Sequence, residues 1–189
     1  MIITIKHFMT LGHRFARAED GTSLAEFAIM VPILTTLLLG GVDVARLAVL
    51  QQKLDRAAST VGDMVSQGQT ITAAQLNDIF NSVAPVIQPF PTARGLVIVT
   101  SVGASGGAAA AINWQRSGGG SLSATSAIGR PGQAPVLPTG FVVRDGETVI
   151  VAESFYNFTP IFLPATVLPR QIYHRSMYRP RLGSLTTIG

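Results

Sequence analysis

The feature that most constrains this chain is an apolar run near its N-terminus, with no charged residue between Glu26 and Asp43. Together with residues 24 and 25, the run approaches the roughly 20 residues that an α-helix needs to cross a bilayer. An ionisable side chain costs roughly 2.5 to 3.5 kcal/mol at the bilayer centre, so by default it is read as a functional group with a partner. The run therefore predicts a single transmembrane helix over about residues 24–42, in which Glu26 is the carboxylate that needs a partner.

Residues on both sides of this run form a recognisable motif. Its N-terminal part consists of Gly21, Glu26, Phe27, Ala28, Pro32, Gly41, Val42, Asp43 and Arg46. Near the other end of the chain, residues 155–160 and 178–182 form an aromatic and proline-rich closing segment. Together these segments resemble the TadE/TadG-like minor pseudopilins of the tight-adherence (Flp, type IVb) pilus system. The resemblance covers both ends of the chain and leaves out its middle.

The resemblance implies a processing site and a subunit contact in the membrane. A prepilin peptidase would cut after Gly21 and free the amine of Thr22, so that residues 1–21 form a cytoplasmic leader. Glu26, followed by Phe27, would then pair in the membrane with the amine of a neighbouring subunit. A carboxylate about one turn from a helix N-terminus also stabilises the positive end of that helix, by roughly 0.3 to 1 kcal/mol. The alternative is an uncut anchor in which Glu26 lies at headgroup depth.

The charges around the run predict its orientation. Lys6, Arg14 and Arg17 precede the span and favour a cytoplasmic N-terminus, although basic residues also follow the span closely. The resemblance places the chain in a bacterial inner membrane as a single-pass protein with a periplasmic C-terminal domain, and allows its incorporation in a pilus. The partners implied are the lipid bilayer, other pilins or pseudopilins, pilus assembly proteins and a prepilin peptidase.

Pro32 lies inside the predicted span, where it removes one helical hydrogen bond and is expected to kink the axis. Membrane helices tolerate such a proline when neighbours or nearby hydroxyls satisfy the freed carbonyl. Thr35 and Thr36 are candidates for local bonding.

Beyond the membrane the helix is predicted to continue as an amphipathic stalk. Apolar residues recur there at steps of three and four, which is typical of one buried helix face: Leu47, Leu50, Leu54, Ala58, Val61 and Val65. We expect this stripe to pack on a sheet of the same chain. A helix over residues 22–67 would be roughly 70 Å long at 1.5 Å per residue, as a pilin-like stalk requires.

The remaining residues, 68–189, are predicted to form a periplasmic α+β domain. Thr72 and Gln75 have the spacing of a capping box that opens a second helix, which is expected to end before Pro85. Strands are expected over residues 95–102, 111–116 and 171–178. Asp145 and Gly146 predict a hairpin turn between strands at 141–143 and 148–155.

The order of helix, helix and then strands indicates an antiparallel sheet laid against the upper half of the long helix, in a pilin-like α+β fold. The segment 117–140 is rich in glycine, serine and proline, and predicts a long flexible loop.

Catalytic and cofactor sites find little support in the sequence. The chain has no cysteine, and its single histidine outside the leader, His174, lies on a predicted strand. After the leader, carboxylates are scattered singly apart from Asp145 and Glu147, and the glycine-rich loops lack a nucleotide-binding pattern. We therefore expect a protein that is not an enzyme, with no catalytic residue, cofactor or metal site.

The chain has more basic than acidic residues, which would suit nucleic-acid binding, but the distribution of its basic residues argues against that function. The formal net charge is +4, but the basic residues are mostly isolated and form no stripe with interleaved aromatics. Two functional classes remain. One is a structural component of pilus assembly that supports adhesion or secretion. The other is a membrane-anchored envelope module that binds a ligand through Tyr156, Phe158 and the arginine-rich C-terminal segment.

Overall fold

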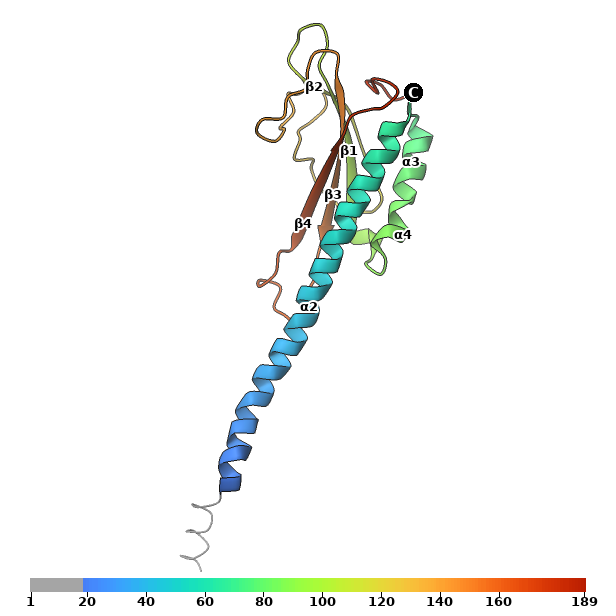
Figure 1. Cartoon of the computed structure of the whole chain (residues 1–189). Helices are drawn as coiled ribbons and strands as arrows, with labels where there is room; N and C mark the ends of the chain where they lie inside the picture. Colours follow the sequence, from blue (N-terminus) through green and yellow to red (C-terminus); the bar gives the residue numbers. More distant parts are fainter. Residues whose placement is uncertain (1–18) are drawn as a thin grey trace, which may run out of the picture. The chain divides into compact units, whose positions relative to one another are not determined.

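The long N-terminal helix dominates the first part of the chain. The computed structural model describes residues 19–189, with side chains from Ser23 onward, so Lys6, Arg14 and Arg17 of the predicted leader lie outside the described residues. Helix α2 (Glu19–Gln67) contains 49 residues (Figure 1). It ends at the predicted residue, Gln67, and on the N-terminal side it already includes Glu19, the first residue that the structure describes. Contacts divide the chain into two units, Met1–Val44 and Ala45–Gly189.

The part of α2 inside the second unit buries the predicted apolar stripe. Leu50, Leu54, Val61 and Val65 are almost completely buried, and Leu47 is 9% exposed. They pack with residues of the sheet in one hydrophobic core. The prediction that this helix packs on a sheet of its own chain is confirmed.

Two short helices follow α2. Helix α3 (Ala73–Asn81) opens with the predicted capping box, in which Gln75 N donates to Thr72 Oγ1 at 3.2 Å and Thr72 N donates to Gln75 Oε1 at 2.9 Å. Helix α3 ends at Asn81, before Pro85 as predicted. A separate helix, α4 (Val83–Ile87), contains Pro85 at its third position. A proline is tolerated there because an N–H in the first turn has no partner within the helix.

The sheet has four antiparallel strands in the order β2-β1-β3-β4. A single 3-10 turn, η1 (Thr92–Arg94), leads into it. The strands are β1 (Gly95–Gly103), β2 (Ala111–Gly118), β3 (Thr148–Asn157) and β4 (Gln171–Tyr178). Strands β1 and β3 lie in the centre, and nearly every residue in them is buried. The predicted α+β class is confirmed, and β4 has the predicted bounds.

The predicted hairpin around Asp145 and Gly146 was wrong. Residues 141–143 form no strand in the structure, although a turn does occur at Asp145 and Gly146. Strand β3 already has β1 on one side and β4 on the other, so no edge remains for a further partner. The turn instead bonds to the end of β1, where Gly146 N donates to Ala104 O at 2.8 Å.

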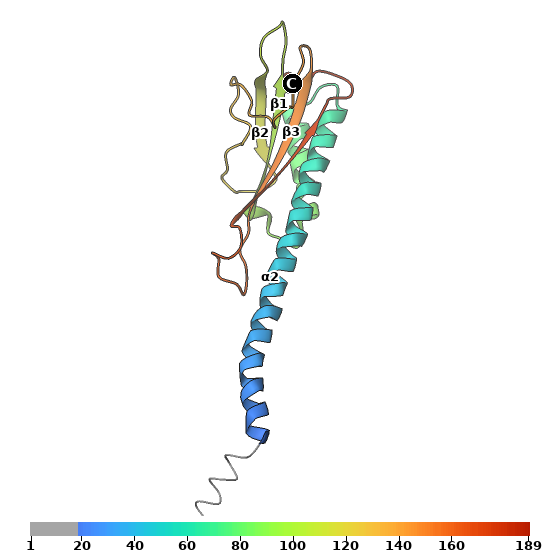
Figure 2. The same ribbon diagram turned by 60° about the vertical axis from the view of Figure 1, so that its left-hand side comes forward.

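The two faces of the sheet are covered differently. In Figures 1 and 2, α2 and α3 lie along one face. The opposite face packs against the connection from β2 to β3, which contains the predicted loop from residue 119 onward and has no helix or strand of its own; residues 117 and 118 belong to β2. Ser126 and Ile128 of this connection are buried, at 8% and 0% exposure. The loop therefore forms the third layer of the domain.

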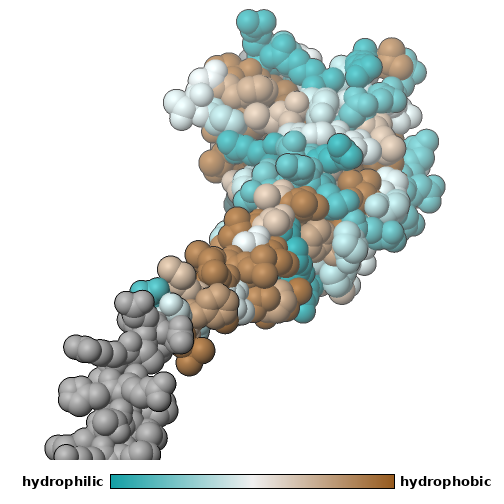
Figure 3. Space-filling view, turned by 60° about the horizontal axis from the view of Figure 1, so that its bottom comes forward, coloured by the Kyte–Doolittle hydropathy of each residue, from teal (hydrophilic) through white to brown (hydrophobic). Residues whose placement is uncertain are grey.

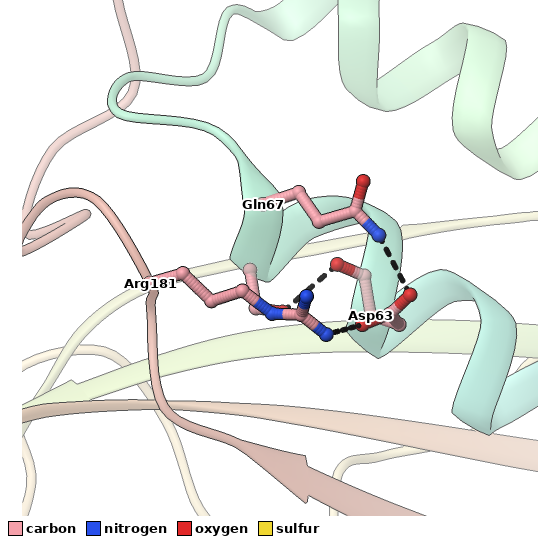
Figure 4. A network of polar contacts seen from close by, with 4 residues as sticks. Asp63, Gln67 and Arg181 are labelled. Atoms are coloured by element: carbon pink, nitrogen blue, oxygen red, sulfur yellow. Dashed lines mark hydrogen bonds and ion pairs between the residues drawn. The ribbon is translucent and has the colours of Figure 1, made fainter.

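The C-terminal tail returns to the end of α2. Arg181 donates to Asp63 Oδ1 at 2.8 Å, and Gln67 Nε2 donates to Asp63 Oδ2 at 2.7 Å (Figure 4). The backbone N–H of Arg181 donates to Ser66 O at 2.9 Å. Further along, Leu185 is 3% exposed, and its carbonyl accepts a hydrogen bond from Trp114 Nε1 at 2.8 Å. The tail thus completes the core on the helical face of the sheet.

Candidate functional site

The first candidate site is the apolar segment of α2, whose side chains are exposed all round. Every side chain from residue 23 to residue 38 is exposed, and Leu24, Phe27 and Leu38 are each about 70% exposed or more. Brown, hydrophobic side chains gather over this part of α2 in Figure 3, next to the grey residues. Among the described residues, one helix is long and apolar enough to cross a membrane, the one at Ser23–Gln67, whose most apolar window has a mean hydropathy of 2.0. A helix that is apolar on every side suits a lipid environment.

Glu26 and Phe27 lie on this exposed segment. Glu26 is exposed, and the next acidic residue along α2 is Asp43, which is fully buried. Gly21 and Thr22 lie in the first turns of α2. Residues four positions apart occupy the same face of a helix, so Thr22 and Glu26 are aligned about one turn apart. The structure tests neither the predicted cleavage after Gly21 nor the predicted pairing of Glu26, so both stay predictions.

Pro32 lies inside α2 with two threonines on the turn after it. Thr35 Oγ1 donates to Val31 O at 2.7 Å, and Thr36 Oγ1 donates to Pro32 O at 2.8 Å. Both threonines therefore bond locally. Neither of these bonds reaches the carbonyl of Ala28, which Pro32 deprives of its donor, because a threonine hydroxyl reaches the carbonyl four residues before it. The two hydroxyls are satisfied within the helix, as lipid surroundings require.

The second candidate is a buried carboxylate that the sequence did not single out. Glu153 on β3 is fully buried and points to the face covered by the loop. Its carboxylate accepts hydrogen bonds from the Ser126 hydroxyl, from the backbone N–H of Ala127 at 2.9 Å and from the Tyr173 hydroxyl at 3.0 Å. Three donors compensate for the loss of water around a buried charge. Glu153 therefore fastens the middle of the β2–β3 connection to the sheet.

The environment of Glu153 raises the pKa of Tyr173. Burial has the largest effect, and the charge of Glu153 and its hydrogen bond act in the same direction. The phenol therefore remains a proton donor to the carboxylate at neutral pH. Burial also raises the pKa of Tyr156, which donates to Pro91 O at 3.1 Å, while Arg94 and Arg46 oppose that shift. Both hydroxyls serve the fold as donors.

The Glu153 cluster has the geometry of a structural contact. The Ser126 hydroxyl donates to the carboxylate and accepts from Ile128 N at 3.1 Å. A hollow of about 380 Å³ nearby is lined by Ser126 together with Arg116 and Arg130. The carboxylate oxygens themselves are occupied by protein donors. The sequence signal that could have drawn attention to this residue is a single glutamate in a strand rich in apolar and β-branched residues.

The other polar residues considered in the sequence are dispersed. His174 is half-buried on β4, opposite Ser154, and Glu147 lies beside Arg179 with 3.4 Å between Oε2 and the guanidinium. Within residues 19–189, no three histidine, aspartate or glutamate side chains come together as metal ligands. Phe158 of the predicted binding segment is buried, and its ring lies 5.7 Å from the Arg46 guanidinium.

These observations define a class of protein. A long helix that is apolar on all sides in its N-terminal part, and that continues into the core of a four-stranded antiparallel sheet, is the architecture of a pilin-like α+β protein. Residues 21–63 match the family described as TadE-like protein. The matched segment contains Gly21, Glu26 and Pro32, and excludes the C-terminal closing segment. Comparison with curated proteins and with solved structures gives no match.

Proposed function

We propose that this chain is a minor pseudopilin-like component of a bacterial tight-adherence (Flp, type IVb) pilus system. It is anchored in the inner membrane by residues 24–42 and supports pilus assembly, and with it adhesion or secretion. The observation that carries the proposal is the exposed apolar helix with the single carboxylate Glu26, within a segment that matches the TadE-like family. Its partners are the bilayer, other pilins or pseudopilins and the pilus assembly proteins.

In this proposal Glu26 is the group that joins subunits within the membrane. Processing after Gly21 makes Thr22 the first residue and leaves its amine free. A carboxylate on one subunit and an amine on the next neutralise each other, which lowers the cost of keeping either charge near lipid. The exposed Phe27 beside Glu26 extends the contact. The domain of residues 68–189 then lies on the periplasmic side, with residues 1–21 in the cytoplasm.

The test of this function compares four strains that lack the chromosomal gene. Three carry a plasmid copy of the gene, and the fourth, the empty deletion strain, carries none. The copies encode the natural chain, Glu26→Ala and Asp55→Ala. Asp55 is an exposed carboxylate on the same helix, in the second unit, and so is the matched control. We expect pili and surface attachment with the natural chain and with Asp55→Ala, and their loss with Glu26→Ala at equal protein levels. Normal pili in the empty deletion strain, together with an altered envelope, would instead indicate an envelope binding module.

Two further measurements test the anchor and its processing. Intact mass of the protein from membranes distinguishes a chain that begins at Met1 from one that begins at Thr22. Fractionation distinguishes an anchored chain from a soluble one, because the anchored chain needs detergent for extraction. A mass that begins at Met1 would remove the cleavage and leave the anchor.

A further inference from the structure

The connection between β3 and β4 exposes large apolar side chains to solvent. Its base is closed by a hydrogen bond from Phe158 N to Arg170 O at 2.8 Å, and Val167 N donates to Pro164 O at 3.0 Å within it. Between these ends, Ile161 is 62% exposed, Phe162 is 49% exposed and Val167 is 61% exposed. We call residues 159–169 the β3–β4 loop. Three large apolar side chains gathered on one short loop mark an interaction surface more often than isolated ones do.

Contacts within the second unit show at which end of the domain this loop lies. Near the start of this unit, the Arg46 guanidinium lies over Phe158, the residue just before the loop. Eight residues further along α2, the carbonyl of Leu54 accepts a hydrogen bond from Ser154 Oγ at 3.0 Å. At the far end, Arg181 N donates to Ser66 O, beyond the other end of β4. The β3–β4 loop therefore lies at the end of the domain where α2 enters.

This end of the domain is the one that the apolar segment joins. The charge-free run ends at Val42, three residues before Ala45, where the second unit begins. Three residues of helix correspond to about 5 Å. A chain held in a bilayer by residues 24–42 therefore holds the entry end of its domain close to the membrane surface.

The charges of this region also suit a lipid surface. No aspartate or glutamate follows Glu153 in the chain, so the β3–β4 loop carries no negative charge. Arg170, directly after the loop, is exposed. Anionic headgroups attract nearby basic residues by about 1 kcal/mol each, and aromatic and aliphatic side chains on a loop enter the boundary between headgroups and acyl chains. The prolines at 160, 164 and 169 keep the loop from adding a strand to another sheet.

We propose that the β3–β4 loop is a second membrane contact, in which Ile161, Phe162 and Val167 insert into the interface of the bilayer that holds the anchor. The ligand is the lipid surface itself, with the side chain of Arg170 at the level of the headgroups. This inference rests on the membrane anchoring proposed above. Two contacts, the span and the loop, fix the tilt of the domain on the membrane, which a single helix leaves free.

The test uses the absence of cysteine from the chain. Single cysteines replace Phe162, Val142 or Leu34 in the full-length protein, and each carries the same environment-sensitive fluorophore. Val142 is the matched control, because it is 69% exposed and precedes β3, so that it lies at the opposite end of the domain from the loop. Leu34 reports on the anchor. The proteins are reconstituted in vesicles of phosphatidylcholine with a minority of phosphatidylglycerol, with nitroxide lipids as quenchers at headgroup or acyl depth.

We expect headgroup-depth nitroxides to quench the label of Phe162→Cys several-fold more than that of Val142→Cys. Deep nitroxides are expected to quench the label of Leu34→Cys. Equal, weak quenching of the first two labels with strong quenching of the third would overturn the loop contact and leave the anchor intact. Weak quenching of all three would overturn the anchor as well.

A second variant and a second condition complete the test. Val167→Cys repeats the measurement at another exposed side chain of the loop and is expected to agree with Phe162→Cys. Trp114 emission confirms that each labelled protein is folded. A loop label that lipid nitroxides leave unquenched, but that becomes shielded from water as protein concentration rises in detergent, would show that a second copy covers the loop and would overturn the proposal.

Discussion

Tyr173 on β4 donates a hydrogen bond to Glu153 on β3, with 3.0 Å between the phenol oxygen and Oε1. The two residues are diagonal neighbours on the loop-covered face, since Glu153 lies opposite Arg175 in the register. This bond and the two bonds from Ser126 and Ala127 join three segments that are distant in sequence. The buried carboxylate thus fixes how these segments meet, because hydrogen bonds are directional and a hydrophobic contact is not.

Glu153→Ala is expected to destabilise the domain strongly. It leaves two hydroxyls and one backbone N–H without their acceptor, each at a cost of about 1 to 3 kcal/mol, so we expect a loss of at least about 3 kcal/mol. Urea unfolding of the detergent-solubilised chain, followed by the fluorescence of the single tryptophan, measures this loss. Glu147→Ala is the control, because its ion pair with Arg179 is partly exposed and should contribute less than about 1 kcal/mol. Equal effects of the two variants would contradict the role of Glu153.

Alkaline pH is expected to destabilise the protein through Tyr173. Burial and Glu153 raise the pKa of Tyr173 above the ordinary value of 10.0, so the folded state holds this proton more tightly than the unfolded state does. The contribution is complete below about pH 10 and is lost as the pH rises towards the higher pKa of the folded state. Melting temperatures between neutral pH and about pH 11 should fall less steeply for Tyr173→Phe than for the natural chain. The pH dependence of the melting temperature that remains in Tyr173→Phe comes in part from Tyr156, whose pKa is also raised. Parallel curves would contradict the assignment.

Gly120→Ala is expected to destabilise the connection after β2. A Cβ atom there would lie 2.1 Å from Gly95 O and 2.3 Å from Thr92 O. Both are backbone atoms, one in η1 and one at the start of β1, and have little freedom to move, so overpacking should cost about 1 to 3 kcal/mol. Thermal unfolding checks this value. Gly41→Ala is the control, because no atom lies within 4 Å of the added carbon, and it should leave the melting temperature unchanged or slightly higher.

Removal of residues 183–189 is expected to expose Trp114. The Leu185 carbonyl accepts hydrogen bonds from Trp114 Nε1 at 2.8 Å and from Ser101 Oγ at 2.9 Å, and the Leu185 side chain is buried. The truncated chain should show a red-shifted tryptophan emission and faster quenching by acrylamide. Leu182→Ala serves as the control, since Leu182 is 65% exposed and should leave the emission unchanged. An unshifted spectrum in the truncated chain would mean that the tail is not part of the core.

The regular elements of this fold could be predicted from the sequence because their signals are local. The stripe from Leu47 to Val65 has helical spacing, and the capping box at Thr72 requires only residues within one turn. Strand pairing is not local. The strand expected at 141–143 failed because the partner of β3 on that side is β4, which lies later in the chain.

The two candidate sites show the same difference between local and non-local signals. Glu26 stands out in the sequence because a charge at the edge of a long apolar run contrasts with its neighbours. Glu153 also contrasts with its neighbours in the strand, but its buried contacts are not predictable from that contrast. The donors that make its burial possible, at residues 126, 127 and 173, come from other segments and have no fixed spacing from it. The packing of the segment 117–140 was likewise beyond prediction, since a glycine- and serine-rich composition describes a loop equally well whether it covers a sheet or extends into solvent.

The outer layer of the domain is held to the sheet by its hydrogen bonds to Glu153 and by buried side chains of its own such as Ile128. Exposed positions of that layer, away from these contacts and from the close approach at Gly120, can change with little effect on the sheet and its helices. This face of the domain can therefore vary in sequence while the fold beneath it stays the same.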